Sequence, residues 1–383
     1  MVNGPPRRDG EDITVKPKWR RIVVKVGTST LTCGGDELDP PRMVDLVRQI
    51  AELRSRGAEV VLVTSGAQQA GRDRLGTSSS GKTIPLKQML AAVGQGRLMH
   101  LWEQYFDLYR IVVAQVLMTR QDTEDRHRYL SLRDTFEQLM ERHIVPVVNE
   151  NDAVATEEIR VGENDTLSAM VASLIEADLL VLLTDIDGLY TCDPTKDPNA
   201  TLVQRVETID EAIHSAACGS NSEQGTGGMQ TKIVAAEIAG RCGTTVAIAN
   251  GSRADVLLGL WDEAVPATWF PAPVSAAEGR KRWLVAQSTT SGAVVVDAGA
   301  ERAIRREGKS LLPVGITSLR GEFGRGAIVS IRSANGDELA RGLANYDSRD
   351  LRRILGHRST EVVQLLGYDY GPEFIHRDKM ALL

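Results

Sequence analysis

Two lysines in this sequence stand beside runs of small residues, a setting in which a lysine can neutralise a phosphate. Lys25 belongs to Val23-Val-Lys-Val-Gly-Thr-Ser-Thr30, an apolar run that passes directly into Gly27. Backbone amides in a turn of small residues can approach phosphate oxygens. Lys232 belongs to Gly225-Thr-Gly-Gly-Met-Gln-Thr-Lys-Ile233, in the first turns of an expected helix, whose amino end favours anions. The alternatives are an edge-strand lysine with a solvated tip and a glycine-rich hinge with an ordinary surface lysine.

Polar side chains stand at further predicted strand ends, where ligands bind in open α/β sheets. Asn149 and Asp152 follow one apolar run, Ser65 follows another, and Asn164 and Asp165 open an expected helix. Carboxylates there can orient lysines, bind a substrate ammonium or hold Mg²⁺ through water. Asp165 could instead stabilise its own helix, and Asn149 and Asp152 could serve turns. The set favours phosphoryl transfer by positioning and charge neutralisation, without a covalent intermediate.

The stretch Gly76–Thr83, GTSSSGKT, matches the phosphate-loop pattern G-x-x-x-x-G-K-[ST]. A working phosphate loop follows a buried strand, and its lysine opens a helix. Here the preceding Ala70–Leu75 is polar and helix-like, and we expect Pro85 to keep Ile84 out of helical geometry. The run Leu179–Asp185 resembles the apolar strand with a metal-binding Asp that often accompanies such loops. We interpret the stretch as an ordinary loop because its own context is wrong.

The elements that must position these residues alternate between strands and helices. Short β-branched runs predict strands at Ile22–Val26, Glu59–Val63, Ile111–Val116, Ile144–Val148, Leu179–Leu183 and Thr245–Ala249. Helical patterns lie at Pro41–Arg56, Leu86–Tyr109, Asp122–Arg142, Asp165–Ala177, Ile209–Cys218 and Gln230–Cys242. This order predicts an α/β fold, a three-layer αβα sandwich with a mainly parallel sheet.

The pattern changes after about residue 265, where prolines mark a linker. Strand candidates follow at Trp283–Ser288, Ala293–Asp297, Leu311–Val314, Ala327–Arg332 and Leu339–Ala344, with a helical piece at Ala300–Arg306. We therefore predict a flexible tail over residues 1–18, an α/β domain over 19–265, a linker over 266–279 and a small mainly β domain over 280–383.

Charge and composition narrow the class of protein. The chain has 383 residues and a net charge of −6, but residues 280–383 hold 17 Lys and Arg against 12 Asp and Glu, so they carry +5 and the rest −11. That asymmetry hints at an anionic partner for the C-terminal part. The first 18 residues lack the apolar core of a signal peptide, no apolar run approaches ~20 residues, and the four cysteines form no C-x-x-C pair. We expect a cytoplasmic protein with reduced thiols and no membrane contact.

Seven blocks, in order, resemble the glutamate 5-kinase branch of the amino-acid kinase family over about residues 20–265. They read VKVGTSTLT, VLVTSGAQQAGR, LAAVGQGRLM, VPVVNENDAVAT, VGENDTLSA, LLTDIDGLYTCDP and GTGGMQTK. The tail, with RKRWL, SLLPVGITSLRGEFGRG, YDSRDLRRILGHRS and LGYDYGPEFIHRD, resembles a PUA domain. The family uses no phosphate-loop motif, in agreement with the context of GTSSSGKT.

The resemblance implies roles for particular residues. Lys25 and Lys232 match lysines that contact ATP phosphates and stabilise the transferring phosphoryl group, and Asp165 matches the carboxylate that organises them. The implied ATP-binding residues are Lys25, Gly27, Thr184, Asp185, Thr226, Gly227, Gly228, Met229, Gln230, Thr231 and Lys232. The implied glutamate-binding residues are Ser65, Asn149, Asp152 and Asn164. No metal ligand from the protein is implied, since Mg²⁺ is expected to arrive on the ATP phosphates.

The implied reaction is ATP-dependent phosphorylation of the L-glutamate γ-carboxylate to L-glutamyl 5-phosphate, the first step of proline biosynthesis. A carboxylate nucleophile is ionised at pH 7, so no general base is needed. The resemblance also suggests a homo-oligomer, feedback inhibition by proline and hand-off of the product to a separate glutamyl-phosphate reductase.

Two alternatives for the function stay open. One is a kinase of the same fold acting on acetylglutamate, aspartate or a nucleotide. The other is an RNA-binding or RNA-modifying protein that uses Arg280-Lys-Arg282 and Arg352-Arg353 of the tail, although stacking aromatics are not interleaved there.

Overall fold

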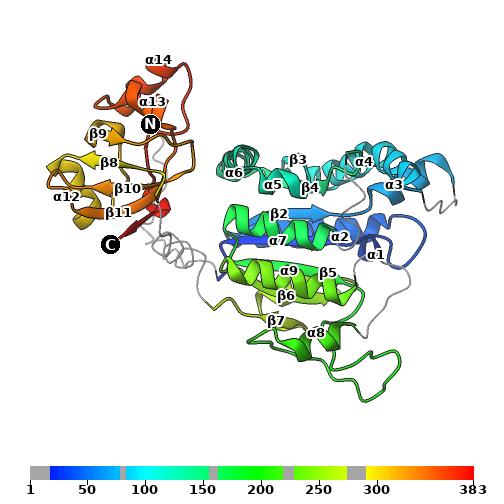
Figure 1. Cartoon of the computed structure of the whole chain (residues 1–383). Coiled ribbons are helices and arrows are strands. Elements are labelled where there is room, and N and C mark those ends of the chain that lie inside the picture. The colour runs from blue at the N-terminus through cyan, green and yellow to red at the C-terminus, as the bar shows by residue number, and fades with distance from the viewer. Residues whose placement is uncertain (1–17, 78–82, 155–162, 219–227, 274–289) are drawn as a thin grey trace, which may run out of the picture.

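The computed structural model of the chain describes residues 18–77, 83–154, 163–218, 228–273 and 290–383, which form two domains with a sheet each (Figure 1). The strand expected at Trp283–Ser288 lies outside the described residues. No helix in these ranges is long and apolar enough to cross a membrane.

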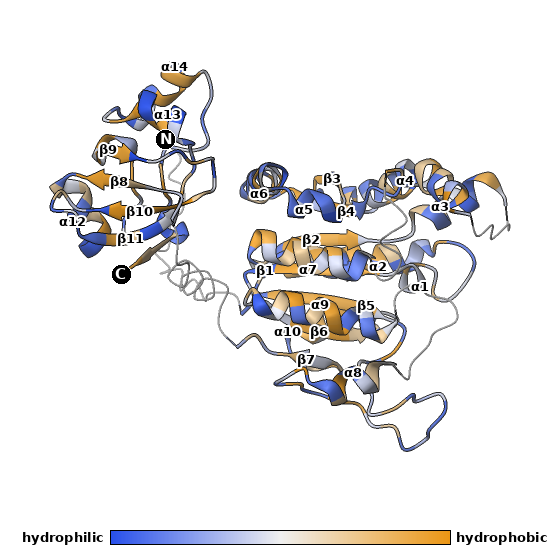
Figure 2. Ribbon diagram, viewed as in Figure 1, coloured by the Kyte–Doolittle hydropathy of each residue, from blue (hydrophilic) through white to orange (hydrophobic). Residues whose placement is uncertain are grey.

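In the described chain, the first sheet has seven strands in the order β3-β4-β2-β1-β5-β6-β7. They are β1 (Arg21–Val26), β2 (Glu59–Thr64), β3 (Val113–Met118), β4 (Val145–Glu150), β5 (Leu179–Thr184), β6 (Thr245–Asn250) and β7 (Thr268–Phe270). Only the β6–β7 pairing among them is antiparallel. The six predicted strands are confirmed; the central ones, β1, β2, β4 and β5, are buried along nearly their whole length, whereas the edge strand β3 is partly exposed. Figure 2 colours the strands of this sheet mainly as hydrophobic.

Helices cover both faces of this sheet and confirm the three-layer prediction. One core contains side chains from α2 (Pro40–Ser55), α3 (Ala67–Leu75), α4 (Ile84–Asp107) and α10 (Val256–Trp261). The opposite core contains side chains from α6 (Arg126–Glu141), α7 (Glu163–Ile175), α8 (Glu211–Cys218) and α9 (Met229–Arg241). Short helices α1 (Thr28–Leu31) and α5 (Arg120–Glu124) follow β1 and β3 directly.

The single helix expected over Asp122–Arg142 is wrong, because the chain breaks between α5 and α6. Asp125 has extended backbone angles, φ −76° and ψ 121°, and its side chain accepts a hydrogen bond from the Arg128 amide. It therefore caps the amino end of α6 and cannot also continue α5.

Helices α3 and α4 cross at two glycines. A Cβ built on Gly94 would lie 1.9 Å from the Ala67 carbonyl oxygen, and one built on Gly71 would lie 2.0 Å from that of Leu90. The backbones approach so closely that neither position has room for a side chain. This crossing fixes α4, which carries a polar residue of the site described below.

The range expected as a linker contains β7, which completes the first sheet at its edge. Its Thr268 is fully buried, and its hydroxyl accepts a hydrogen bond from the Leu189 amide at 2.8 Å. A strand of three residues between prolines is too short to show an alternation of apolar and polar residues.

The second domain is mainly β, as expected. Its sheet runs β12-β11-β10-β8-β9, with β8 (Gly292–Val296), β9 (Ile316–Arg320), β10 (Ile328–Arg332), β11 (Glu338–Leu343) and β12 (Met380–Leu382). Its helices are α12 (Ala298–Glu307), α13 (Ser348–Ile354) and α14 (Val362–Leu366). The strand expected at Leu311–Val314 is wrong, since only Leu311 forms a bridge and a 3₁₀ turn covers Pro313–Gly315.

The second domain contacts α6 of the first. Arg325 forms an ion pair with Asp134 and stacks on the Tyr370 ring, with its guanidinium carbon 3.6 Å from the ring centroid. Lys379 Nζ lies 3.8 Å from Glu137 Oε1, also on α6. Two cations of the second domain thus meet two carboxylates of one helix.

Candidate active site

Strand periodicity decides which way Lys25 points. Successive side chains of a strand alternate between the faces of the sheet. Val24 and Val26 belong to the core beside α2 and α4, whereas Val23 belongs to the core beside α7 and α9. Lys25 therefore points to the α7 and α9 side, one residue before the carboxyl end of the central strand.

Three charged side chains meet there. Lys25 Nζ lies 2.6 Å from Asp165 Oδ1, and Lys232 Nζ lies 3.2 Å from Asp165 Oδ2. Asp165 is in the first turn of α7 and Lys232 is in the first turn of α9. The amino ends of two helices therefore place a carboxylate and a second lysine beside the strand lysine Lys25. All three are buried, with exposed fractions of 7% for Lys25, 1% for Asp165 and 4% for Lys232.

The electrostatics of this trio favour an anionic ligand. Burial raises the pKa of Asp165, but the attraction of both lysines and their hydrogen bonds outweigh it and lower the pKa to about 2. Burial is also the largest influence on Lys232 and lowers its pKa, with a smaller contribution from the positive charge of Lys25, against the attraction of Asp165. Two lysines share one carboxylate, so the trio carries a net charge of +1 in a place with little water. This excess positive charge favours the binding of an anion.

Further residues surround the trio. The Thr231 hydroxyl donates to Asp165 Oδ2 at 2.7 Å, next to Lys232. A Cβ built on Gly27 would lie 3.5 Å from Lys25 Nζ, so a glycine there leaves the space beside the ammonium open. Gly228 caps α9, Met229 is buried and Gln230 is exposed. Thr226 and Gly227, expected in the same glycine-rich run, lie outside the described residues.

Thr184 ends β5, and Asp185 follows it at the same edge of the sheet. The Thr184 hydroxyl donates to Asp185 Oδ1 at 3.0 Å. The Asp185 carboxylate is exposed, and its charge acts to raise the pKa of Lys232. The structure therefore brings the expected nucleotide-site pair to the trio.

A second polar cluster lies at the ends of β2 and β4. The Asn164 amide donates to Ser65 Oγ at 2.9 Å and to Asn149 Oδ1 at 3.1 Å, which joins three of the four expected substrate residues. Asn164 precedes Asp165 in the chain, so this cluster adjoins the trio. Asp152 lies in the turn two residues beyond β4, at the same edge of the sheet.

Gln95 belongs to this cluster and was missed from the sequence. Its Oε1 accepts a hydrogen bond from the Asn149 amide at 2.8 Å. It sits inside the long helix α4, where a glutamine has no local signal of function. The signal that could have found it is its place in LAAVGQGRLM, one of the seven blocks quoted above.

The GTSSSGKT stretch joins α3 to α4, so no strand precedes it. The expectation for Ile84 is wrong, because α4 begins at that residue with Pro85 in its first turn, where proline is tolerated. Residues 78–82, including Lys82, lie outside the described residues. The helix α3 before the stretch fits an ordinary connection between helices.

Fold and site together define a phosphotransferase, in which a parallel sheet delivers two buried lysines and a shared carboxylate to one edge. The Amino acid kinase family matches residues 20–250, and the PUA domain matches residues 292–366. The chain belongs to the amino acid kinase family. It is 50% identical to the glutamate 5-kinase of Herpetosiphon aurantiacus over 94% of this chain and 98% of that protein. It is also 50% identical to the glutamate 5-kinase of Deinococcus radiodurans over 95% and 100%, and 49% identical to that of Vibrio vulnificus over 95% and 96%.

Proposed function

We propose that this protein transfers the γ-phosphoryl group of ATP to the γ-carboxylate of L-glutamate and so performs the first step of proline biosynthesis. The observation that carries the proposal is the Lys25–Asp165–Lys232 trio, a buried site of net charge +1 that suits a transferring phosphoryl group. Relatives about 50% identical over nearly the whole chain support glutamate as the acceptor and disfavour the acetylglutamate, aspartate, nucleotide and RNA alternatives.

The chemistry needs positioning more than proton transfer. A γ-carboxylate oxygen of glutamate forms a bond to the γ-phosphorus while the bond to the bridging oxygen of ADP breaks, and ADP leaves with that electron pair. Negative charge spreads over the phosphoryl oxygens and the leaving oxygen. Lys25 and Lys232 neutralise it, while Asp165, which accepts a hydrogen bond from Thr231, holds the lysines in place. No residue has to remove a proton, because the nucleophile is already ionised.

We propose that a divalent cation enters this site together with ATP. Within the described residues, no three His, Cys, Asp or Glu side chains gather to hold a metal. Mg²⁺ commonly binds through one or two carboxylates together with substrate phosphates, and the exposed Asp185 is the carboxylate available beside Lys232. When bound, Mg²⁺ neutralises phosphate charge as a Lewis acid.

The polar cluster at the ends of β2 and β4 would hold the amino acid. Ser65, Asn149 and Asn164 offer a hydroxyl and two amides. Asn164 Oδ1 is buried and accepts no hydrogen bond from the described residues, so an acceptor remains for a substrate ammonium. Asp152, at the same edge, would pair with that ammonium and disfavour an N-acylated analogue, which lacks the charge.

Asp152→Asn tests this recognition. We expect the KM for glutamate to rise strongly, by about 10- to 100-fold, because a charge-assisted contact is lost. The KM for ATP should stay unchanged, which serves as the internal control in steady-state kinetics. An unchanged KM for glutamate would remove Asp152 from the site.

The resemblance extends the proposal beyond the reaction itself. It favours a cytoplasmic homo-oligomer inhibited by proline, with the acyl phosphate passed to a separate reductase. Each of these properties is separable from the chemistry. Proline added to the assay below tests the inhibition directly.

The decisive assay traps the product with hydroxylamine and measures γ-glutamyl hydroxamate that depends on ATP, Mg²⁺ and L-glutamate. Aspartate and N-acetylglutamate run beside it as alternative acceptors. Hydroxamate from glutamate alone is the expected result. Folded, nucleotide-binding protein that forms no hydroxamate from glutamate would refute the proposed function.

A further inference from the structure

Asp187 lies on the loop that leaves β5, residues 185–188, which we call the β5 exit loop. This loop begins with Asp185 of the expected nucleotide site. The Gly251 amide donates to the Thr184 carbonyl at 2.7 Å at its start, and the Leu189 amide donates to Thr268 just after its end. Between these anchors Ile186 packs against the core beside α7 and α9, and Asp187 makes an ion pair with Arg253.

Arg253 holds Asp187 with a two-pronged contact. Arg253 Nε donates to Asp187 Oδ1 and Nη2 donates to Oδ2, both at 2.7 Å. Such paired bonds fix orientation as well as distance. The Asn250 and Tyr190 side chains also form hydrogen bonds with this carboxylate, which is therefore enclosed by donors.

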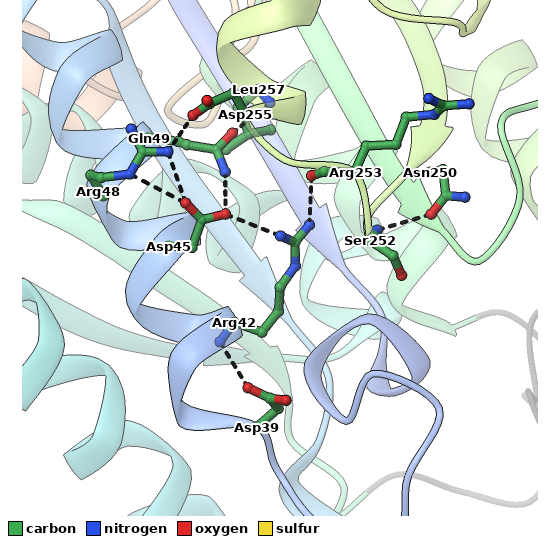
Figure 3. A network of polar contacts seen from close by, with 10 residues as sticks. All are labelled: Asp39, Arg42, Asp45, Arg48, Gln49, Asn250, Ser252, Arg253, Asp255 and Leu257. Carbon is green, nitrogen blue, oxygen red and sulfur yellow. Dashed lines mark hydrogen bonds and ion pairs between the residues drawn. The ribbon is translucent and has the colours of Figure 1, made fainter.

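Arg253 is itself fixed from behind. Figure 3 shows its carbonyl oxygen facing Arg42 of α2, while its guanidinium points away from that helix. Arg42 is 9% exposed, and its Nη2 donates to the Arg253 carbonyl at 3.2 Å while its Nη1 donates to Asp45 at 3.0 Å. A buried arginine thus ties the loop after β6 to the body of the domain.

Two further links hold the end of this loop, residues 251–255, and the first turn of α10 that follows it. Gln49, which is fully buried, accepts a hydrogen bond from the Leu257 amide at 2.8 Å and donates to Asp45 (Figure 3). Arg48 bonds both Asp45 and Asp255. Arg42 and Gln49 are the buried members of this network, whereas Arg48 and Asp255 are partly exposed. Hydrogen bonds of buried side chains are stronger than those in water. The helix α2 network therefore gives Arg253 a firm base.

From this chain of contacts we infer that Arg253 is a positioning residue of the nucleotide site, which acts through Asp187 to hold Thr184 and Asp185 in their binding arrangement. This rests on the proposed function for the identity of the nucleotide, ATP. The Arg253 side chain is 41% exposed and that of Asp187 is 20% exposed, so this ion pair adds little to the stability of the fold. Its effect is to reduce the ordering that the loop must undergo when nucleotide binds.

The test compares Arg253→Ala with Arg56→Ala. Arg56 is a matched control, because it is also a partly exposed arginine paired with carboxylates, Glu52 and Asp262, but it lies where α2 ends, far along that helix from the braced loop. The readouts are the Kd of a non-hydrolysable Mg²⁺–ATP analogue without any amino acid, the KM for ATP, the KM for glutamate and kcat.

We expect Arg253→Ala to raise the Kd and the KM for ATP about tenfold, a normal size for coupling between neighbouring residues. The KM for glutamate and kcat should stay within about twofold, and Arg56→Ala should match wild type. Arg253→Lys keeps the positive charge but cannot form the paired contact with Asp187. Its Kd should therefore lie between those of wild type and Arg253→Ala. Exchanging the partners, Asp187→Arg with Arg253→Asp, should recover part of the affinity that either single change loses.

An unchanged Kd in Arg253→Ala would overturn the inference, and so would an equal loss in Arg56→Ala. If Arg253→Ala does not fold, the Kd of the ATP analogue is measured for Arg253→Lys and for the double exchange of Asp187 and Arg253. An unchanged Kd in Arg253→Lys would then overturn the inference. The binding measurement uses no amino acid. A wild type that binds nucleotide but makes no hydroxamate would refute the proposed function and leave this inference standing.

Discussion

Replacing Asp165 by asparagine removes the negative charge that two buried lysines share. The side chain keeps its size, but Lys25 and Lys232 then face each other without compensation at 7% and 4% exposure. Breaking a buried ion pair by removal of one partner typically costs about 3–5 kcal/mol of unfolding free energy. For a domain of this size that corresponds to a fall of roughly 6–20 °C in Tm.

The assay is thermal unfolding of the nucleotide-free protein, with and without inorganic phosphate. Asp165→Asn should melt lower than wild type, and phosphate should raise its Tm more than that of wild type, because the site now carries two positive charges. Turnover should fall by about 10²–10³, since the lysines lose their arrangement. Asp178→Asn is the control. Asp178 accepts the Arg20 and Arg21 amides at 2.8 and 2.9 Å at the start of β5, so its loss should lower Tm and spare turnover.

Acid should reproduce the effect of the substitution. Since the folded pKa of Asp165 is about 2, below the ordinary 3.8, its contribution to stability is present above about pH 4 and disappears as the pH falls towards 2. Asp165→Asn should lack that part of the acid transition. A variant with wild-type Tm and wild-type turnover would refute the claim that the carboxylate organises the lysines.

Three further predictions concern the loop, the pH dependence and the fold. Lys82→Ala should leave turnover within a few-fold of wild type in the hydroxamate assay, and a loss of about 10³ or more would restore the phosphate-loop interpretation. The lowered pKa of Lys232 means that its charge is lost at a lower pH than an ordinary lysine loses it, so kcat/KM for ATP should fall on the alkaline side. Lys232→Arg should abolish that limb of the pH profile, and an unchanged limb would exclude Lys232 as its source. Gly94→Ala should cost about 1–3 kcal/mol in urea unfolding, because its Cβ would meet the Ala67 carbonyl at 1.9 Å. Gly96→Ala on the same helix meets nothing within 4 Å and should be neutral or stabilising, so equal effects would contradict the packing argument.

The sequence predicted β1 to β6 of the first sheet because they contain apolar runs, which in the central strands are buried on both faces. The short β7 was missed. The apolar runs did not predict which side chains meet at the carboxyl ends of the strands. The spacing of these residues along the chain does not indicate that the Nζ atoms of Lys25 and Lys232 both lie within 3.2 Å of the Asp165 carboxylate. That meeting depends on the parallel order of β1 and β5 and on the alternation that turns Lys25 towards α7.

The errors have local causes. Asp125 ends one helix and starts another, and an Asp in a polar helical pattern carries no sign of which role it takes. The strand β9, Ile316–Arg320, was not expected because most of its residues are exposed. Gln95 reaches Asn149 from the interior of a helix, 54 residues away in the chain, and Arg253 acts through Asp187, 66 residues away. Such contacts come from tertiary structure alone.

The central position of β1 has a consequence for how the protein is made. Its two neighbours are β2, which follows soon in the chain, and β5, whose paired residue Leu179 lies far beyond Ile22. The Arg20–Asp178 contact spans 158 residues, which a ribosome needs roughly 8–30 s to synthesise. During that time one edge of the first strand has no partner strand, and unpaired edges invite association with other chains. Lys25 emerges early but gains Asp165 and Lys232 only when the second half of the sheet closes. A growing chain therefore carries an unpaired strand edge before it can bind the nucleotide that would stabilise it.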